Sequence, residues 1–330
     1  MQKLSLRAVR RALAVSCAAS VLIAVGTAAT LAEVFPQRPV KIIVQTAAGS
    51  SIDVAARILA ENLSRKWGQQ AYVVNQPGAG GAIATRAAAS APPNGETLLF
   101  AASSIFVALP VMHPEEAASV DKFLPVAFVG EQPMAVAVRA SDPARTFPEL
   151  LAAMRNTGGG LNCAVSTRGG LSHMSGEMLK DAVGAKMTFV HYPGTAQALS
   201  DVIGGRVPMV IDSMSAFIGP AAGGQVRILG VASAERLTKI LPDVPTISET
   251  LPGFEAIAWL ALVAPAGTPA PVVARIKSDV DAILSDAAVS KRLQDLGTLT
   301  HPMSQTELAA FIKAQRAKWL PIVQRYGSAK

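Results

Sequence analysis

VKIIVQTAAGSSID, residues 40–53, is the stretch that decides the fold. It opens with a β-branched run at 40–44, passes through a loop of small residues and ends on polar residues. We expect Ser51 to cap a helix with Asp53 in its first turn. Apolar residues then recur at helical spacing until Gly68: Ile58, Leu59, Leu63 and Trp67. This strand, tight loop and helix form the repeating unit of an α/β sheet.

The rest of the chain alternates between the same two patterns. Further strands are expected at residues 72–75, 97–101, 134–138, 161–165, 187–190, 209–212 and 228–232. Further helices are expected at residues 82–91, 148–155, 172–183, 196–203, 269–284 and 305–326. The sequence therefore predicts an α/β protein whose sheets are mainly parallel and covered by helices.

The N-terminus has the pattern of an export signal. Four basic residues precede an uncharged run at 12–32: Lys3, Arg7, Arg10 and Arg11. We expect cleavage near Ala32. A run of about 20 apolar residues also suffices to span a bilayer, but this one is rich in Ala, Ser, Thr and Gly and makes a poor anchor. Arg10–Arg11 leaves twin-arginine export open beside the general route, and Cys17 follows Arg11 too closely for lipidation.

Length and charge narrow the class of protein. Removing 32 of the 330 residues leaves 298, which suggests two lobes. The signal holds four of 30 basic and none of 23 acidic residues, so the mature net charge is 26 minus 23, or +3. Aromatic residues make up only 5% of the chain, and no basic run interleaves with them. We therefore expect no nucleic-acid partner.

Cysteine and histidine usage argues against disulfides and metal. Only Cys163 survives processing, so no internal disulfide is possible, and we expect it to be a small buried side chain in a strand. The histidines are scattered and show no ligand spacing: His113, His173, His191 and His301. We predict no metal site and no cofactor.

Three loops that follow strands are rich in Gly, Ser and Thr. The first holds Ala47, Ala48, Gly49, Ser50 and Ser51; the second Ser103 and Ser104; the third Ser166, Thr167, Arg168, Gly169, Gly170 and Ser172. Ligands of open α/β sheets bind past the carboxyl ends of strands. At the first loop, free amides at a helix start suit a carboxylate or phosphate. The alternative is a tight loop whose serine only caps its helix.

Three side chains near these loops have two interpretations each. Arg168 is able to pair with a carboxylate in a bidentate manner, although a loop arginine is usually solvated. Asp212 ends an apolar strand and either orders the region through backbone amides or binds a ligand amino group. His173 is expected to hydrogen-bond the third loop rather than transfer protons.

Motifs for nucleotide binding and catalysis are missing. Residues 78–81, Gly-Ala-Gly-Gly, lack the third glycine of the dinucleotide fingerprint and the lysine of a phosphate loop, which leaves a structural turn. Gly-x-Ser-x-Gly, His-Glu-x-x-His and paired carboxylates are absent from the sequence. Ser172, His173 and Asp181 are near in sequence, which does not make a triad. We expect that this protein is not an enzyme.

Seven ordered motifs then resemble one family. They are FPQRP at 35–39, NQPGAGG at 75–81, PPNGETLL at 92–99, SHMSGE at 172–177, GGRV at 204–207, LPDVPT at 241–246 and APAGTP at 264–269. Read in order, they resemble the substrate-binding proteins of tripartite tricarboxylate transporters, also called Bug receptors. The chain departs from that family at Ala47, Ala48 and Ser50, where prolines and paired glycines are common, and at Arg168, where the residue is usually small or neutral.

The resemblance implies a periplasmic-binding-protein-like (type 2) Venus flytrap. Its first lobe would be residues 33–135 with 233–330, and its second 136–232. The loop after the first strand would hold a ligand carboxylate, and closure would recruit Ser166, Gly170, Ser172 and Thr195. The full set of expected ligand-binding residues is Ala48, Gly49, Ser50, Ser51, Asp53, Ser103, Ser104, Ser166, Thr167, Arg168, Gly170, Ser172, Thr195 and Asp212.

The same resemblance implies a periplasmic receptor that carries a small carboxylate to transporter membrane subunits or a sensor. We expect this receptor to be a monomer. Two other classes stay open. One is an exported hydrolase on a similar fold that uses Ser172 or Ser104. The other is a membrane-anchored scaffold, which requires residues 12–32 to persist.

Overall fold

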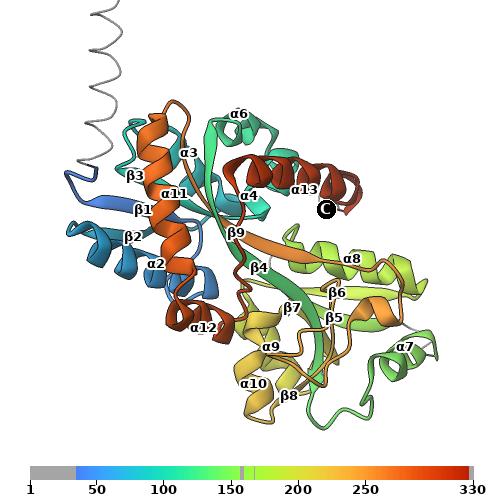
Figure 1. Cartoon of the computed structure of the whole chain (residues 1–330). Helices are drawn as coiled ribbons and strands as arrows, with labels where there is room; N and C mark the ends of the chain where they lie inside the picture. The colour runs from blue at the N-terminus through green and yellow to red at the C-terminus, as the bar shows by residue number, and fades with distance from the viewer. Residues whose placement is uncertain (1–34, 157–159, 167, 327–330) are drawn as a thin grey trace, which may run out of the picture.

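The computed structural model describes residues 35–156, 160–166 and 168–326. Two α/β lobes are joined by a long strand and by segments that run beside it (Figure 1). The expected export signal at 1–32 and the loop residue Thr167 lie outside the described residues. Among the described helices, none is both long and apolar enough to cross a bilayer.

The sheet of the first lobe has three parallel strands, then a strand antiparallel to them, then a strand antiparallel to that one. In spatial order they are β2 (Ala71–Asn75), β1 (Val40–Val44), β3 (Thr97–Ala102), β9 (Ile257–Pro265) and the first part of β4 (Phe123–Arg139). Ile42 of β1 lies between Val73 and Leu98. Apart from the half-buried Lys41, the strand is buried on both faces, which explains why the rest of its sequence is apolar.

The sheet of the second lobe repeats this plan. Its strands are β6 (Met187–Tyr192), β5 (Leu161–Ser166) and β7 (Met209–Ser213), which are parallel, then the end of β4, which lies antiparallel to its two neighbours β7 and β8 (Val226–Val231). Cys163 is fully buried in β5, as expected.

Strand β4 passes from one sheet to the other. It pairs with β9 as far as Pro133 and with β7 and β8 from Met134 onward. At this point Met134 accepts a main-chain hydrogen bond from Ala232 (2.7 Å) and donates one to Ala256 (2.9 Å). Ala256 in turn donates to Ala232 over 3.0 Å. Where β4 crosses between the lobes, these three segments thus form a small hydrogen-bonded patch of backbone.

Helices cover both sheets (Figure 1). In the first lobe, α2 (Ser51–Trp67) and α11 (Ala270–Leu284) pack on each other and enclose a core that contains Ile42, Leu59 and Ile276. The other helices are α3 (Ala82–Ala89), α4 (Ser104–Val107), α5 (Leu109–Met112), α6 (Ala117–Val120), α7 (Phe147–Asn156), α8 (Leu171–Val183), α9 (Thr195–Ile203), α10 (Ile218–Ala222), α12 (Ala287–Asp295) and α13 (Gln305–Tyr326).

Most of the expected elements are confirmed to within two or three residues, and 305–326 matches α13. Strand β9 and the first part of β4 were missed. Their apolar runs are buried on both faces and show no alternation, so periodicity does not separate them from helix. The expected cap was wrong by one residue: Ser50, not Ser51, caps α2 by accepting from the N–H of Asp53.

Candidate functional site

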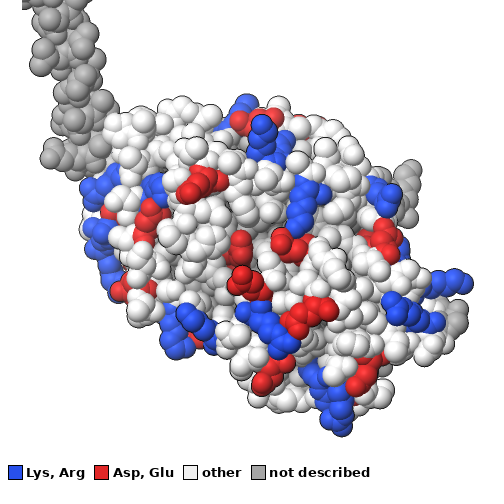
Figure 2. Space-filling view, turned by 45° about the vertical axis from the view of Figure 1, so that its right-hand side comes forward, with Lys and Arg blue, Asp and Glu red and all other residues white. Residues whose placement is uncertain are grey.

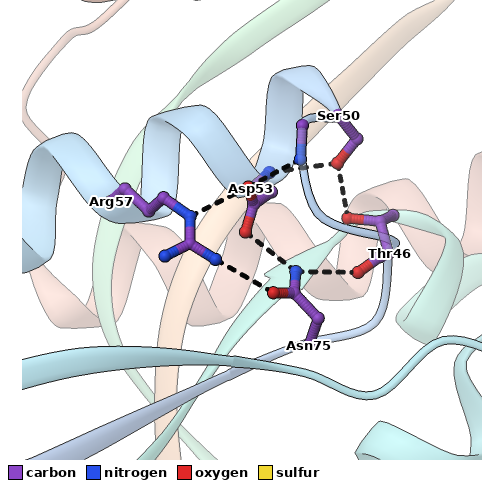
Figure 3. Close-up of polar contacts among 6 residues, drawn as sticks. Thr46, Ser50, Asp53, Arg57 and Asn75 are labelled. Carbon is purple, nitrogen blue, oxygen red and sulfur yellow. Dashed lines mark hydrogen bonds and ion pairs between the residues drawn. The ribbon is translucent and has the colours of Figure 1, made fainter.

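The loop between β1 and α2 is held by its own side chains (Figure 3). The N–H of Gly49 donates to Oδ2 of Asp53 over 2.8 Å. The hydroxyl of Ser50 accepts from the N–H of Asp53 at 3.1 Å and pairs with the hydroxyl of Thr46 at 2.7 Å. Gly49 has a φ of +83°, a left-handed conformation that glycine adopts without strain. These hydrogen bonds therefore hold the start of the helix in a polar network.

Asp53 is at the centre of this network and is only 2% exposed. Besides Gly49, its carboxylate accepts from Nε of Arg57 at 3.0 Å and from Nδ2 of Asn75 at 2.8 Å. Burial alone would raise the pKa of Asp53, but these three hydrogen bonds outweigh it, so the pKa lies below its ordinary value. Asp53 orders the loop, and its carboxylate does not face solvent.

This arrangement corrects the expectation that Gly49 offers a free amide, because its N–H is already bonded. The N–H of Ser50 makes a long bond of 3.4 Å to Ala47. Within the described part of the chain, the N–H groups of Ser51 and Ile52 have no hydrogen-bond acceptor. The available donors are thus shifted into the first turn of α2, at the positive end of its dipole.

The second loop follows β3. Ser103 is fully buried, its N–H donates to the carbonyl of Trp259 at 2.8 Å, and its hydroxyl has no partner among the described residues. Ser104, which begins α4, is half-buried. Ser104 is therefore better placed than Ser103 to contact a bound molecule.

At the corresponding sheet edge of the second lobe, hydrogen bonds form a network around Ser172 and Asp212. The Ser172 hydroxyl donates to the carbonyl of Ile211 at 2.6 Å and accepts from the N–H of Ser166 at 3.0 Å. Both bonds lie within the protein, and the side chain is almost fully buried. The hydroxyl of Ser172 is thus used to join β5, β7 and α8, which leaves it unsuited to act as a nucleophile.

Asp212 is 6% exposed and accepts from the hydroxyl of Thr195 at 3.0 Å and the N–H of Ser213 at 2.7 Å. Burial raises the pKa of Asp212, and bonds from Ser166, Ser213 and Thr195 offset part of that rise. Its carboxylate therefore orders the ends of β5 and β7 and the start of α9, in line with the first of its two predicted roles.

The third loop is anchored by a histidine. Nδ1 of His173 accepts from the N–H of Gly169 at 3.2 Å, which confirms the expected structural role. Burial first, then the nearby charges of His191 and Arg168, lower the pKa of His173 to about 4. Arg168 is exposed, and Gly170 precedes the first turn of α8 with no side-chain cap.

Sequence reasoning missed Thr46, Arg57 and Asn75, which complete the network around Asp53. A signal was present for Asn75: it ends the strand parallel to β1, and the register places it directly beside Val44. Residues 78–81 form the expected structural turn, in which a side chain on Gly81 would meet Ile105 at 3.3 Å.

Comparison with known proteins settles the family. Residues 55–328 match the model of the tripartite tricarboxylate transporter family receptor. The chain belongs to this family. A UPF0065 protein of Bordetella bronchiseptica is 36% identical over 307 residues, which cover 93% of this chain and 91% of the relative. The resemblance inferred from the ordered motifs is therefore confirmed.

Two solved members have closely similar folds. A Rhodopseudomonas palustris protein solved with adipate is 29% identical, with a TM-score of 0.82 over 89% of this chain and 98% of its own. MatC from the same organism, solved with malate, is 32% identical, with a TM-score of 0.77 over 88% of this chain and 100% of its own. This chain thus has the two-lobed periplasmic-binding-protein fold and is a solute receptor rather than an enzyme.

The surface is consistent with that class. On the face drawn in Figure 2, basic and acidic residues are interspersed, and no broad patch of one sign appears. Among the described residues there is no cluster of three or more His, Cys, Asp and Glu side chains placed to hold a metal ion.

Proposed function

We propose that this protein is an exported periplasmic receptor that captures a small carboxylate-bearing metabolite between its two lobes. Two members of its family that share about 30% of its residues were solved with adipate and with malate. The dicarboxylate character of both molecules makes small organic acids the first class to test.

One observation carries the proposal: the unbonded N–H groups of Ser51 and Ile52 lie at the start of a helix 17 residues long. A carboxylate placed there accepts charge-assisted hydrogen bonds and lies at the positive end of the dipole. The adjoining residues Ala47, Ala48 and Gly49 are exposed, so this helix start is reachable from solvent. Asp53 supports the site by holding the loop in position.

The second lobe would supply the opposing wall. Ser166, Gly170 and Thr195 stand at the ends of β5 and at the starts of α8 and α9. We propose that closure about the backbone patch at Met134 brings these groups to the solute. The lobe boundaries at 135/136 and 232/233 remain predictions.

The export route and partners belong to the same proposal. A signal cleaved near Ala32 would release a monomer into the periplasm, where membrane subunits of a transporter or a sensor would recognise the loaded form. Mass measurement of the exported protein tests the cleavage site. A mass that includes residues 1–32 would favour the membrane-anchored alternative.

Ligand class is tested by a thermal-shift screen of mono-, di- and tricarboxylates, amino acids and aromatic acids. A specific ligand at 100 times its dissociation constant stabilises the folded state by about 2.7 kcal/mol. Failure of every acid to shift the unfolding temperature would overturn the proposal. Recovery of the bound acid unchanged after long incubation distinguishes a receptor from a hydrolase.

The donor site is tested by replacing Ser51, the first residue of α2, with proline. Ser51→Pro removes one N–H but suits the first helical turn, and Ser50 already has the extended backbone that proline requires of its neighbour. We expect unchanged stability and roughly tenfold weaker binding of the best acid, the cost of one hydrogen bond to a charged group. Ser51→Ala removes only the hydroxyl and is the matched control.

A further inference from the structure

The C-terminal helix α13 touches both lobes. Its body packs on α4, α5 and β4, and Arg316 pairs with Asp121 of the first lobe at 3.0 Å. Its last turn instead reaches α8 of the second lobe, where Arg325 pairs with Asp181 at 3.3 Å. The hydroxyl of Tyr326 also hydrogen-bonds Asp181. Figure 1 shows α13 lying above α8.

A second side chain of α8 reinforces this contact. Nζ of Lys180 lies 5.5 Å from the ring centre of Tyr326 and 5.5 Å from that of Phe189, within the range of a cation–π interaction. Lys180 also forms an ion pair with Glu177 of the same helix. The two lobes are therefore tied at the far end of α8 by polar and cation–π contacts with Asp181 and Lys180.

Helix α8 connects this tie to the candidate site. It begins at Leu171, directly after Gly170, and Asp181 lies nine positions beyond Ser172. At 1.5 Å per residue the two points are about 14 Å apart along one rigid rod. A rotation of the second lobe that moves the start of α8 toward the first lobe also displaces its end relative to α13.

We infer that the contact of Asp181 with Arg325 and Tyr326 is a latch that favours the open arrangement of the lobes and so lowers solute affinity. The loop at Ala47–Gly49 is exposed, and a Cβ on Gly49 would meet no atom within 4 Å, so the first-lobe side of the site is uncovered and we take the arrangement to be the open one. The inference rests on the proposed function for its effect on affinity. Its effect on the lobe arrangement stands independently of any solute.

The expected change in solute affinity follows from the shift between the open and closed populations. When only a fraction of the receptor is in the closed form, the apparent dissociation constant is the intrinsic one divided by that fraction. Weakening a contact made only in the open form raises the closed fraction. Since exposed ion pairs contribute modestly, removing this one should tighten binding by about two- to fivefold.

The experiment compares Asp181→Asn and Tyr326→Phe with Arg316→Gln. Arg316→Gln breaks another exposed ion pair of the same helix, but within the first lobe, and serves as the matched control. Lobe separation is measured by spin labels on Gln70→Cys and Lys186→Cys, exposed positions before β2 and β6. Cys163 is buried and its thiol pKa is raised, so it does not take up label.

Without solute, we expect both latch variants to shift the distance distribution toward that of the solute-bound protein, whereas the control does not. With the acid found in the screen, we expect two- to fivefold tighter binding only in the latch variants. An unchanged distribution, or weaker binding, would overturn the latch. If no acid binds the wild-type protein, the proposed function fails, and the distance measurement still decides whether the latch exists.

Discussion

The main-chain N–H of Gly49 donates to the carboxylate of Asp53, four residues further on, over 2.8 Å. A carboxylate in the first turn of a helix thus occupies a donor that the same loop would otherwise present to a solute. The unbonded donors are displaced to Ser51 and Ile52. In return the loop is fixed, because Asp53 is itself bound by Arg57 and Asn75.

Replacing Asp53 with asparagine should destabilise the protein by about 1–3 kcal/mol, the cost of leaving buried polar groups badly paired. The new amide group would face donors, among them Nδ2 of Asn75. Urea unfolding measures the change. Glu61→Gln, which alters exposed ion pairs with Arg65 and Arg292, is the control and should stay within about 0.5 kcal/mol of wild type.

The stabilising effect of Asp53 should depend on pH. Its folded-state pKa lies below the ordinary value of 3.8, so the folded protein binds this proton less tightly than the unfolded chain does. The contribution is complete above the ordinary value and is lost as the pH falls through the lowered pKa. We expect the difference in unfolding free energy between wild type and Asp53→Asn to be constant from neutral pH down to about 5 and to shrink in stronger acid. A difference that grows on acidification would contradict this.

Asp212 should behave in the opposite sense. Burial raises its pKa, so its favourable contribution is present below the ordinary value of 3.8 and is lost as the pH rises through the folded-state pKa. The neutral variant Asp212→Asn is therefore expected to unfold at an equal or higher urea concentration than wild type at pH 7. A clear loss of stability at pH 7 would show that the ionised carboxylate is required to hold Thr195 and Ser213.

Gly176 lies inside α8 but should not tolerate alanine. A Cβ at this position would lie 2.5 Å from Cε1 of Phe189, whose ring packs against His173. Moving that ring should cost about 1–3 kcal/mol, more than the helix gains from alanine. Gly219→Ala in α10, where no atom lies within 4 Å, should instead stabilise by about 0.4–1 kcal/mol. Thermal unfolding of both variants tests the contrast.

Patterns among neighbouring residues in the sequence were sufficient to predict much of the fold. The β-branched run at Val40–Val44 and the helical spacing from Ile58 to Trp67 depend only on near neighbours, so their elements were predicted correctly. The same holds for α13, whose ends were predicted without error. The ordered motifs that indicated the family are local for a related reason: most of them lie at turns or at a helix start.

The tertiary structure alone decided which donors remain available. Asn75 reaches Asp53 only because β2 lies parallel to β1, and the N–H of Gly49 was lost to a carboxylate that the sequence placed merely nearby. The latch likewise joins Asp181 to Tyr326 across 145 positions of the chain. A hydrogen bond depends on distance in space and on the competing partners there, and neither quantity is encoded in the spacing of residues along the chain.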